Sequence, residues 1–377
     1  MKVSVKKCAT YDYELVKKTI ETCLSELGGL EAFVKPGETV LLKPNLLTKK
    51  RPDEAVTTNP VFVKAVADIL LHFGAKVVIG DSPGGPFTNT LLGTVYKSTG
   101  MTWISNETQA VLNKNFGTFT KENPDGLIMK KPTLTDMLND VDKVVNLAKL
   151  KTHAMMAYTG AVKNMFGLVP GVAKLEYHLN ISDYDAFADA LIDICIAVKP
   201  ALSFIDGIFG MEGDGPAGGT PVNSKVVLAS ACPYHLDVAA CKFIGLASND
   251  VPILRRLEAR GMVGPIDYTG ETPESLRLTP FVPASTKGVM NLASPKIPNL
   301  LKKFIARYVQ TRPVFVQKKC NGCGMCKNSC PAKIIEISDG LPKLDYKDCI
   351  RCYCCHELCP NKAVKIHKPL LSKFMRL

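Results

Sequence analysis

The C-terminal part of the chain is defined by two stretches, Cys320-Asn-Gly-Cys323-Gly-Met-Cys326-Lys-Asn-Ser-Cys330-Pro331 and Cys349-Ile-Arg-Cys352-Tyr-Cys-Cys355-His-Glu-Leu-Cys359-Pro360. Both have the spacing C-x2-C-x2-C-x3-C-P, which is typical of loops that hold [4Fe–4S] clusters. Three cysteines on one tight loop can reach three corners of a cubane, while the fourth begins the next helix and points to the other cluster. The spacing therefore predicts two clusters, one bound by Cys320, Cys323, Cys326 and Cys359 and the other by Cys349, Cys352, Cys355 and Cys330.

Two other kinds of site share parts of this pattern. The segment Cys352-Tyr-Cys-Cys355-His356 matches the c-type haem attachment signature, but its cysteines already belong to the duplicated frame. Zinc ribbons also use paired C-x2-C spacings, but they do not require the C-x3-C-P continuation twice. Neither cluster needs Cys354, and we expect it not to be a ligand.

The composition places this module in an intracellular protein. Nine of the 14 cysteines lie between Cys320 and Cys359, whereas a disulfide framework would suit a small secreted domain. The charged start of the chain does not resemble a secretory signal, and no apolar run is long enough to span a membrane. We expect a cytoplasmic protein without a transmembrane segment.

The charge narrows the choice of partners. The formal net charge is +12, and two oxidised clusters with their thiolates would reduce it to about +8. Such a surface suits an anionic small molecule, an acidic redox partner or a membrane face, and the charge alone does not choose among them. The basic residues form no dense run, which argues against nucleic acid. The sequence does not indicate the oligomeric state.

The first roughly 290 residues alternate short apolar runs with amphipathic segments, which predicts an α/β domain with a mainly parallel sheet. The expected strands and helices are 2–5, 39–43, 76–80, 143–147, 202–205 and 225–229, and 13–27, 61–73, 184–198 and 233–246. The C-terminal module is expected to be a small α+β ferredoxin-like domain. The expected division is 1–293 for the α/β domain, 294–312 for a linker, and 313–377 for the module and its tail.

Polar residues follow several expected strands. Asn45, Asp81 with Ser82, the segment from Lys149 to His153, and Asp206 are placed at carboxyl ends, where ligands collect in such sheets. Each could instead be a turn residue or a helix cap. The glycine-rich stretch 207–216 offers backbone that a ligand can approach, and the role of Glu212 and Asp214 within it stays open between ligand contact and loop cap.

A basic segment from Lys149 to His178 is harder to explain as a turn. It contains four lysines, Lys149, Lys151, Lys163 and Lys174, together with His153, His178 and several glycines. Lysines and backbone N–H groups can hold an anion together, although a solvated basic loop is the alternative. No nucleotide-binding glycine motif is present in the chain.

These residues carry a family resemblance. The motifs 43–45 (Lys-Pro-Asn), 80–84 (Gly-Asp-Ser-Pro-Gly), 149–153 (Lys-Leu-Lys-Thr-His), 159–164 (Thr-Gly-Ala-Val-Lys-Asn) and 206–207 (Asp-Gly) resemble the domain-of-unknown-function 362 family over nearly the whole chain. The C-terminal module resembles two-cluster bacterial ferredoxins. The family resemblance implies an iron–sulfur protein of anaerobic metabolism, with no single agreed activity.

A more remote resemblance concerns one segment. The pattern of His153, Lys163 and His178 is similar to the catalytic segment of nickel-pincer lactate racemases, which implies that these three residues line a ligand or cofactor site. The racemases place a further catalytic histidine where this chain has Asp81 and Ser82. The architecture is thus expected to be shared while the chemistry differs.

The sequence favours an iron–sulfur oxidoreductase. Electrons would pass from an acidic ferredoxin or flavodoxin, or from a partner enzyme, through two clusters to an anionic substrate or a second cofactor in the α/β crevice. A flavin or another organic cofactor would fit there, although no motif indicates one. The expected catalytic residues are Lys163, His153, His178, Asp81 and Asp206, and the expected cofactor-binding residues are Asn45, Ser82, Lys149, Lys151, Gly160 and Asn164.

Two alternatives stay open. The protein would be a non-catalytic carrier or adaptor that docks a redox enzyme, or a metallocofactor assembly factor. The segments 299–310 and 370–377 are apolar and basic, and either would touch a membrane surface or, more simply, help to dock the module on the larger domain.

Overall fold

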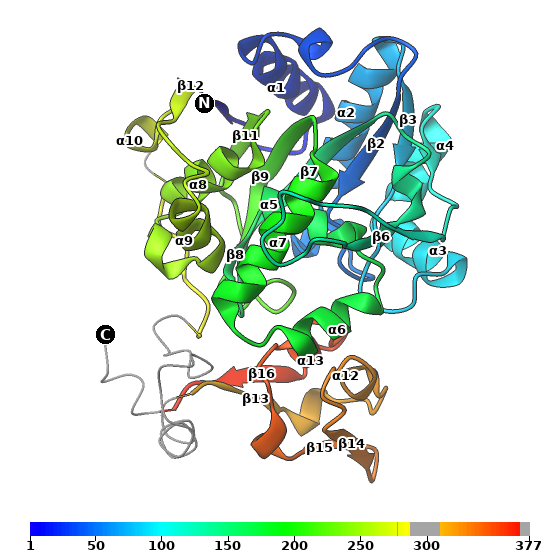
Figure 1. The fold of residues 1–377 in the computed structure, drawn as a ribbon, viewed down its shortest axis with the longest axis vertical. Helices are drawn as coiled ribbons and strands as arrows, with labels where there is room; N and C mark the ends of the chain where they lie inside the picture. Colours follow the sequence, from blue (N-terminus) through cyan, green and yellow to red (C-terminus); the bar gives the residue numbers. More distant parts are fainter. Residues whose placement is uncertain (277, 287–309, 370–377) are drawn as a thin grey trace.

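A computed structural model of the chain describes residues 1–276, 278–286 and 310–369. A ten-stranded sheet forms the centre of the larger domain, in the order β12-β1-β11-β9-β7-β2-β3-β4, with β8 paired to β7 and β10 paired to β9 (Figure 1). The strands β4, β3, β2, β7 and β9 are parallel, whereas β11 is antiparallel to both of its neighbours. The expected α/β domain with a mainly parallel sheet is confirmed.

The strands of this sheet are β1 (Lys2–Lys7), β2 (Thr39–Pro44), β3 (Lys76–Ile79), β4 (Val111–Leu112), β7 (Lys143–His153), β8 (Ala157–Thr159), β9 (Leu202–Glu212), β10 (Thr220–Val222), β11 (Val226–Ser230) and β12 (Asp267–Gly270). A separate short hairpin joins β5 (Thr118–Thr120) to β6 (Thr133–Thr135).

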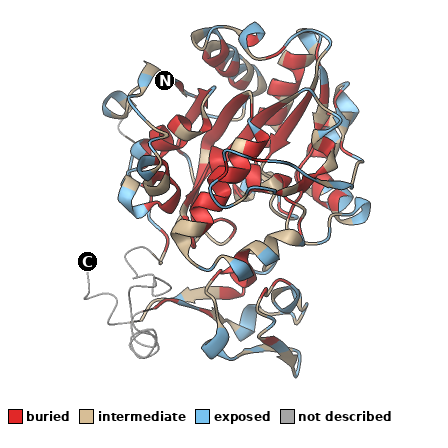
Figure 2. Cartoon of the chain, viewed as in Figure 1, coloured by how far each residue is buried: buried red, intermediate tan, exposed pale blue. Residues whose placement is uncertain are grey.

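Helices cover both faces of the sheet. Along β2, Val40 and Leu42 face one apolar cluster and Leu41 faces the other, because successive side chains of a strand point to opposite sides. The first cluster is covered by α1 (Tyr13–Glu26), α2 (Pro60–His72), α3 (Asn89–Ser98) and α4 (Met101–Glu107). The second is covered mainly by α5 (Ala161–Asn164), α7 (Tyr184–Val198), α8 (Pro233–Phe243) and α9 (Pro252–Ala259). The buried centre of this three-layer arrangement is visible in Figure 2, and α6 (Ala173–Asn180) and α10 (Pro273–Leu276) lie at its margins.

Local sequence explains where the long helices begin. Asp183 precedes α7, and its carboxylate accepts hydrogen bonds from the backbone N–H groups of Asp185 and Ala186 at 3.0 and 2.9 Å. Asn59 caps α2 in the same way, with Pro60 as the first helical residue. Both helices lie where the periodicity predicts them.

Two strands are longer than the sequence predicts. β7 continues to His153 and β9 continues to Glu212, so the segment from Lys149 to His153 and Asp206 lie inside strands and not beyond their ends. The first half of the glycine-rich stretch is therefore strand and not flexible loop. The reason is that Asp206 neutralises Lys149 and that neutral oxygens of Asn45 and Val56 accept from Lys151, so these charged side chains do not end the strands.

The C-terminal domain is small and contains both strands and helices, as expected. Two antiparallel hairpins pair β13 (Arg312–Phe315) with β16 (Val364–His367) and β14 (Ile335–Ser338) with β15 (Leu341–Leu344). Each cysteine motif includes a one-turn helix, α12 (Met325–Asn328) in the first and α13 (Cys354–Glu357) in the second.

The second cysteine motif packs against the α/β domain. Tyr353 is buried within the larger domain's apolar cluster, and the Tyr184 hydroxyl donates a hydrogen bond to the Arg351 carbonyl at 3.4 Å. The His356 ring lies 2.9 Å through its Nε2 from the Asp214 carbonyl oxygen and 2.7 Å through its Nδ1 from the Val364 carbonyl oxygen. We call this contact between the domains the seam.

Two glycines of the larger domain permit this close approach. A Cβ atom on Gly218 would come within 2.4 Å of the His356 ring, and one on Gly84 would come within 2.8 Å of Leu358. At the edge of the seam, the Lys50 ammonium donates to the Pro360 carbonyl at 3.4 Å.

The division at 293 and 312 stays a prediction, because most of the predicted linker lies outside the described residues. The same holds for most of the amphipathic segment 299–310 and for the whole of 370–377. Within the described ranges, no helix combines the length and the apolar character that crossing a membrane would require.

Candidate functional site

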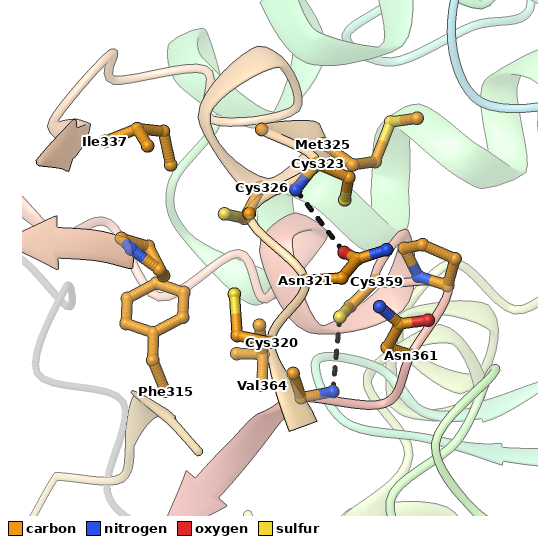
Figure 3. Close-up of a pocket in the computed structure, with 15 residues that line it drawn as sticks. Phe315, Cys320, Asn321, Cys323, Met325, Cys326, Ile337, Cys359, Asn361 and Val364 are labelled. Atoms are coloured by element: carbon orange, nitrogen blue, oxygen red, sulfur yellow. Dashed lines mark hydrogen bonds between the residues drawn. The ribbon is translucent and has the colours of Figure 1, made fainter. Parts of the chain in front are cut away.

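The cysteines of the predicted first cluster share one cavity. Figure 3 shows this cavity, which is lined by Cys320, Cys323, Cys326 and Cys359 together with the apolar residues Phe315, Ile337 and Val364. The Asn321 side chain accepts a hydrogen bond from the Cys323 backbone N–H at 3.4 Å, and the Ala363 N–H donates to the Cys359 sulfur at 3.2 Å. Cys323 is exposed, so this cavity, here called the outer cavity, lies at the surface.

The loops between the cysteines have the backbone that an anionic cluster requires. Gly322 and Gly324 have positive φ values of 72°, and Arg351 and Tyr353 at the matching positions of the second motif have φ values of 55° and 61°. A left-handed residue within a loop turns successive N–H groups toward one centre, which favours bound negative charge. Arg351 and Tyr353 hold this conformation without being glycines, at a cost of roughly 1–2 kcal/mol each.

The cysteines of the predicted second cluster lie on the inner side of the domain. Cys352 and Cys355 are buried, in contrast to Cys323. Burial raises the pKa of the Cys355 thiol well above its usual value, and the neighbouring sulfurs of Cys352, Cys349, Cys330 and Cys326 raise this pKa further. The other three thiols of the predicted second set are thus near Cys355, and so is Cys326 of the first set. Three cysteines of this set, Cys349, Cys352 and Cys355, belong to the motif that packs on the α/β domain, whereas the first set has only Cys359 there. The second set is therefore closer to the seam.

Cys354 is buried next to Cys355 in the second motif. Its thiol lowers the pKa of the nearby Cys352 thiol. Among the described residues, no three His, Cys, Asp or Glu side chains converge on a single ion. A cubane differs from a single ion in that it is held at its outer corners by thiolates that stand well apart. The cysteine arrangement and the loop backbone both fit such a group.

On the α/β side, several predicted site residues form a closed hydrogen-bonded network. Lys149 and Asp206 are buried partners, with 2.8 Å between Nζ and Oδ2, and Tyr11 contacts both of them. Lys43 pairs with Asp81 at 2.8 Å and donates to the Asn164 side chain at 2.9 Å. The carboxylates of Asp81 and Asp206 also accept backbone N–H groups, so the protein itself uses both of them fully.

Three more predicted binding residues also make contacts within the α/β domain: Lys151 and Asn45 through hydrogen bonds, and Gly160 through close packing. The Lys151 ammonium donates to the Asn45 side chain at 2.8 Å and to the Val56 carbonyl at 2.7 Å. Burial lowers the pKa of Lys151 to about 7. A Cβ atom on Gly160 would lie 2.0 Å from the Tyr158 hydroxyl, so this glycine is required for packing within the domain.

A second group of predicted residues retains unused polar atoms beside the seam. His153 accepts backbone N–H groups from Met155 and Met156 at its Nδ1, at 3.0 and 3.2 Å, which assigns the ring proton to Nε2. Although His153 is only 2% exposed, its Nε2 has no hydrogen-bond partner among the described residues. Burial and the nearby Lys163 charge hold the pKa of His153 well below its usual value, so the ring is neutral.

Lys163 lies beside His153, and its ammonium is not paired with any described carboxylate. Lys163 is half-buried, and its ammonium lies 5.7 Å from the centre of the Phe166 ring. This ammonium makes no hydrogen bond or ion pair with any residue that the structure describes. Burial lowers the pKa of Lys163, while the Glu357 carboxylate acts in the opposite direction. Lys174 faces the same ring but donates to the Ser82 carbonyl.

Two further predicted site residues each have a buried polar atom without a hydrogen-bond partner among the described residues. These atoms are Nδ1 of His178 and the hydroxyl of Ser82. The His178 ring stacks on Phe187, and burial lowers the pKa of His178 to about 3. The structure thus brings together Lys163, His153 and His178, whose polar atoms are partly without partners. They differ in this from Asp81 and Asp206, whose carboxylates are fully hydrogen-bonded by the protein.

The structure adds one residue that the sequence analysis missed. Glu357 of α13 extends its carboxylate toward the larger domain, with Oε2 3.8 Å from the His153 Nε2. Its only sequence signal is its place between two cluster cysteines, Cys355 and Cys359. We call Lys163, His153, His178, Lys174 and Glu357 the seam cluster.

Glu212 and Asp214 of the glycine-rich stretch both accept hydrogen bonds from the protein. Glu212 accepts the Val282 N–H at 2.8 Å, and Asp214 accepts the N–H and hydroxyl of Ser285 at 2.7 and 3.0 Å. In the structure, both carboxylates cap the segment that follows residue 281.

Comparison with known proteins identifies both parts of the chain. The family described as "Domain of unknown function (DUF362)" matches residues 40–242, which is more than half of the chain. This chain belongs to the DUF362 family. The 4Fe-4S dicluster domain family matches residues 312–360, so the chain is an iron–sulfur protein, and both sequence-based identifications are confirmed.

This DUF362 protein is 32% identical over 261 residues to the thylakoid-associated protein sll1697 of Synechocystis sp., covering 69% of this chain and 79% of the relative.

Two solved structures are similar to this DUF362 protein. One is the lactate racemase apoprotein of Thermoanaerobacterium thermosaccharolyticum, with a TM-score of 0.40, 16% identity and coverage of 64% of this chain and 56% of that chain. The other is a Thermotoga maritima protein, with a TM-score of 0.34, 13% identity and coverage of 57% and 55%. The chain therefore spans little more than half the length of either solved protein.

Proposed function

We propose that this protein is an oxidoreductase that passes electrons from an external low-potential donor through two [4Fe–4S] clusters to an anionic ligand at the seam. The observation that carries this proposal is the packing of the second cysteine motif on the α/β domain beside unpartnered Lys163 and His153. A carrier that only shuttled electrons between partners would gain nothing from a buried, unpaired imidazole N–H at this place.

The residues of the seam cluster have distinct roles in this proposal. Lys163 attracts the anion and supplies hydrogen-bond donors, and His153 donates its Nε2–H. His178 is kept neutral by burial, so it can accept a hydrogen bond at Nδ1 without adding charge. Bound clusters would supply one-electron transfer, and two of them could together deliver an electron pair.

The outer cavity is suited to receive electrons. Cys323 is exposed there, and the neighbouring Lys318, Lys319 and Lys327 are exposed as well. None of these three lysines forms an ion pair with a described residue, so their charge is available to an acidic donor protein. A flavodoxin-type donor fits this surface. An organic cofactor such as a flavin is an alternative occupant of the seam.

Native mass spectrometry of protein purified without oxygen is the first test. We expect wild-type protein to carry a small molecule in addition to its clusters. This molecule is expected to be lost in Lys163→Met and retained in Lys347→Met, a matched change at an exposed lysine of the module.

A kinetic measurement covers a ligand that dissociates during purification. The protein is reduced with photoreduced flavodoxin and then mixed with the low-molecular-mass fraction of a cell extract. We expect the clusters of Lys163→Met to reoxidise at least about tenfold more slowly than those of Lys347→Met, which corresponds to about 1.4 kcal/mol. Equal reoxidation rates, together with no extra mass in the wild type, would refute the seam ligand and favour a carrier.

A further inference from the structure

The seam cluster contains one carboxylate that faces two unused donors. Glu357 lies with its Oε2 3.8 Å from the His153 Nε2, which is too far for a direct hydrogen bond. Its carboxylate also acts electrostatically on Lys163, Lys151 and Lys174, but no ion pair with these lysines is formed within 4 Å. The carboxylate is therefore near the donors without satisfying them.

The hydrogen bonds define which seam lysine can hold a ligand. Lys151 is used by Asn45 and Val56, and Lys174 is used by the Ser82 carbonyl. Lys163 is then the seam lysine whose ammonium has no hydrogen-bond or ion-pair partner among the described residues.

The geometry of the donors narrows the ligand class further. A carboxylate has two oxygens and can accept from an ammonium on one side and an imidazole N–H on the other. A phosphate presents four oxygens, which is more than these two unused donors can satisfy. The donor set therefore favours a small carboxylate.

We propose that the seam binds a small monocarboxylate and that this ligand takes the place of the Glu357 carboxylate. The inference rests on the proposed function, because it concerns the same Lys163 and His153 donors. The Glu357 carboxylate then competes with the ligand for the Lys163 ammonium and the His153 Nε2–H, and it lies opposite these donors when no ligand is bound. Since it belongs to α13, between Cys355 and Cys359, its displacement changes the surroundings of residues from both predicted ligand sets.

Acetate is the probe for the test, and calorimetry of anoxically purified protein with its clusters is the measurement. We expect Glu357→Gln, which keeps the shape and removes the competing charge, to bind acetate at least about tenfold more tightly than the wild type. Glu357→Ala serves as a second variant with the same expectation. Glu336→Gln, at an exposed position of the same domain, is the matched control and should equal the wild type.

Two additions distinguish the possible failures. Lys163→Met in the Glu357→Gln background should abolish acetate binding, and inorganic phosphate should show no comparable gain in any variant. The electron paramagnetic resonance spectrum of the reduced protein should change with acetate in Glu357→Gln and remain unchanged in the double variant. Iron content of each variant shows that the domain is intact.

Acetate binding that is equal in Glu357→Gln, Glu357→Ala and wild type, or absent from all three, would overturn the competition by Glu357. The dependence of reoxidation on Lys163, measured as described above, would still stand in that case. A gain for phosphate as large as that for acetate would overturn the carboxylate assignment alone. Loss of the Lys163 effect on reoxidation would instead refute the proposed function.

Discussion

The buried pair of Lys149 and Asp206 allows a sharp test of which polar residues stabilise the fold and which bind a ligand. Their charged atoms are 2.8 Å apart, and the two side chains are 1% and 0% exposed. Changing Lys149 to Met removes the ammonium and leaves a buried carboxylate without its counter-ion. Breaking such a pair costs about 3–5 kcal/mol. Tyr11 and the Asn59 N–H still donate to Asp206, so we expect the lower end, about 3 kcal/mol.

The double variant Lys149→Met/Asp206→Asn separates the charge effect from lost packing. Without either charge, the amide can still accept from Tyr11, and we expect at least half of the lost free energy of unfolding to return. Urea denaturation of anoxically purified protein is the assay. The single tryptophan, Trp103 of α4, reports on the α/β domain, while visible absorbance follows the clusters separately.

Two results would refute this reasoning. A cost below about 1 kcal/mol for Lys149→Met would mean that the pair is not held as a buried ion pair. A double variant that loses the sum of both single changes would mean that the two charges do not interact. In either case Lys149 would return to the candidates for ligand binding.

Three further outcomes are expected. Burial raises the pKa of Asp237 from 3.8 to about 7, so the folded state binds the proton more tightly and the free energy of unfolding should fall by about 4 kcal/mol in total as pH rises from about 3.8 to about 7. Asp237→Asn should lack this part of the slope in urea titrations, and an unchanged slope would contradict the assignment. Cys354→Ser should keep the wild-type iron content and Cys355→Ser should lose about half, as measured by iron analysis; equal losses would make Cys354 a ligand. His356→Ala removes the ring whose two nitrogens face the Asp214 and Val364 carbonyls, at about 1–3 kcal/mol for the carbonyl that loses its N–H donor. Amide hydrogen exchange near residue 214 should rise, and unchanged exchange would show that this contact does not hold the seam.

Local sequence was sufficient for features that depend on neighbouring residues. The cysteine spacing predicts iron–sulfur binding because a tight loop must itself reach several corners of one cluster. Amphipathic periodicity predicts α7 at 184–198, where the structure has it, because one face of a helix is buried and its cap is adjacent in sequence. The α/β class follows from the alternation of such segments.

The same local rules failed for β7 and β9. A lysine normally indicates that a strand has left the core, so the sequence pattern predicts that Lys149 and Lys151 lie beyond the strand. In the structure, Asp206 compensates the charge of Lys149 from the neighbouring strand, and Asn45 and Val56 accept from Lys151. Compensation between strands depends on pairing partners that are distant in sequence, so no local pattern contains it.

The sequence by itself determined the cluster-binding module, the α/β class and the set of polar residues from which the site is drawn. Only the tertiary structure decided which of these residues are already used by the protein and which are left with unpaired atoms, as Lys163 and His153 are. It also placed Glu357 opposite them, because the seam forms only when the second cysteine motif packs on the larger domain. Hydrogen bonding and burial are properties of the assembled neighbourhood, so a list of residue types cannot specify them.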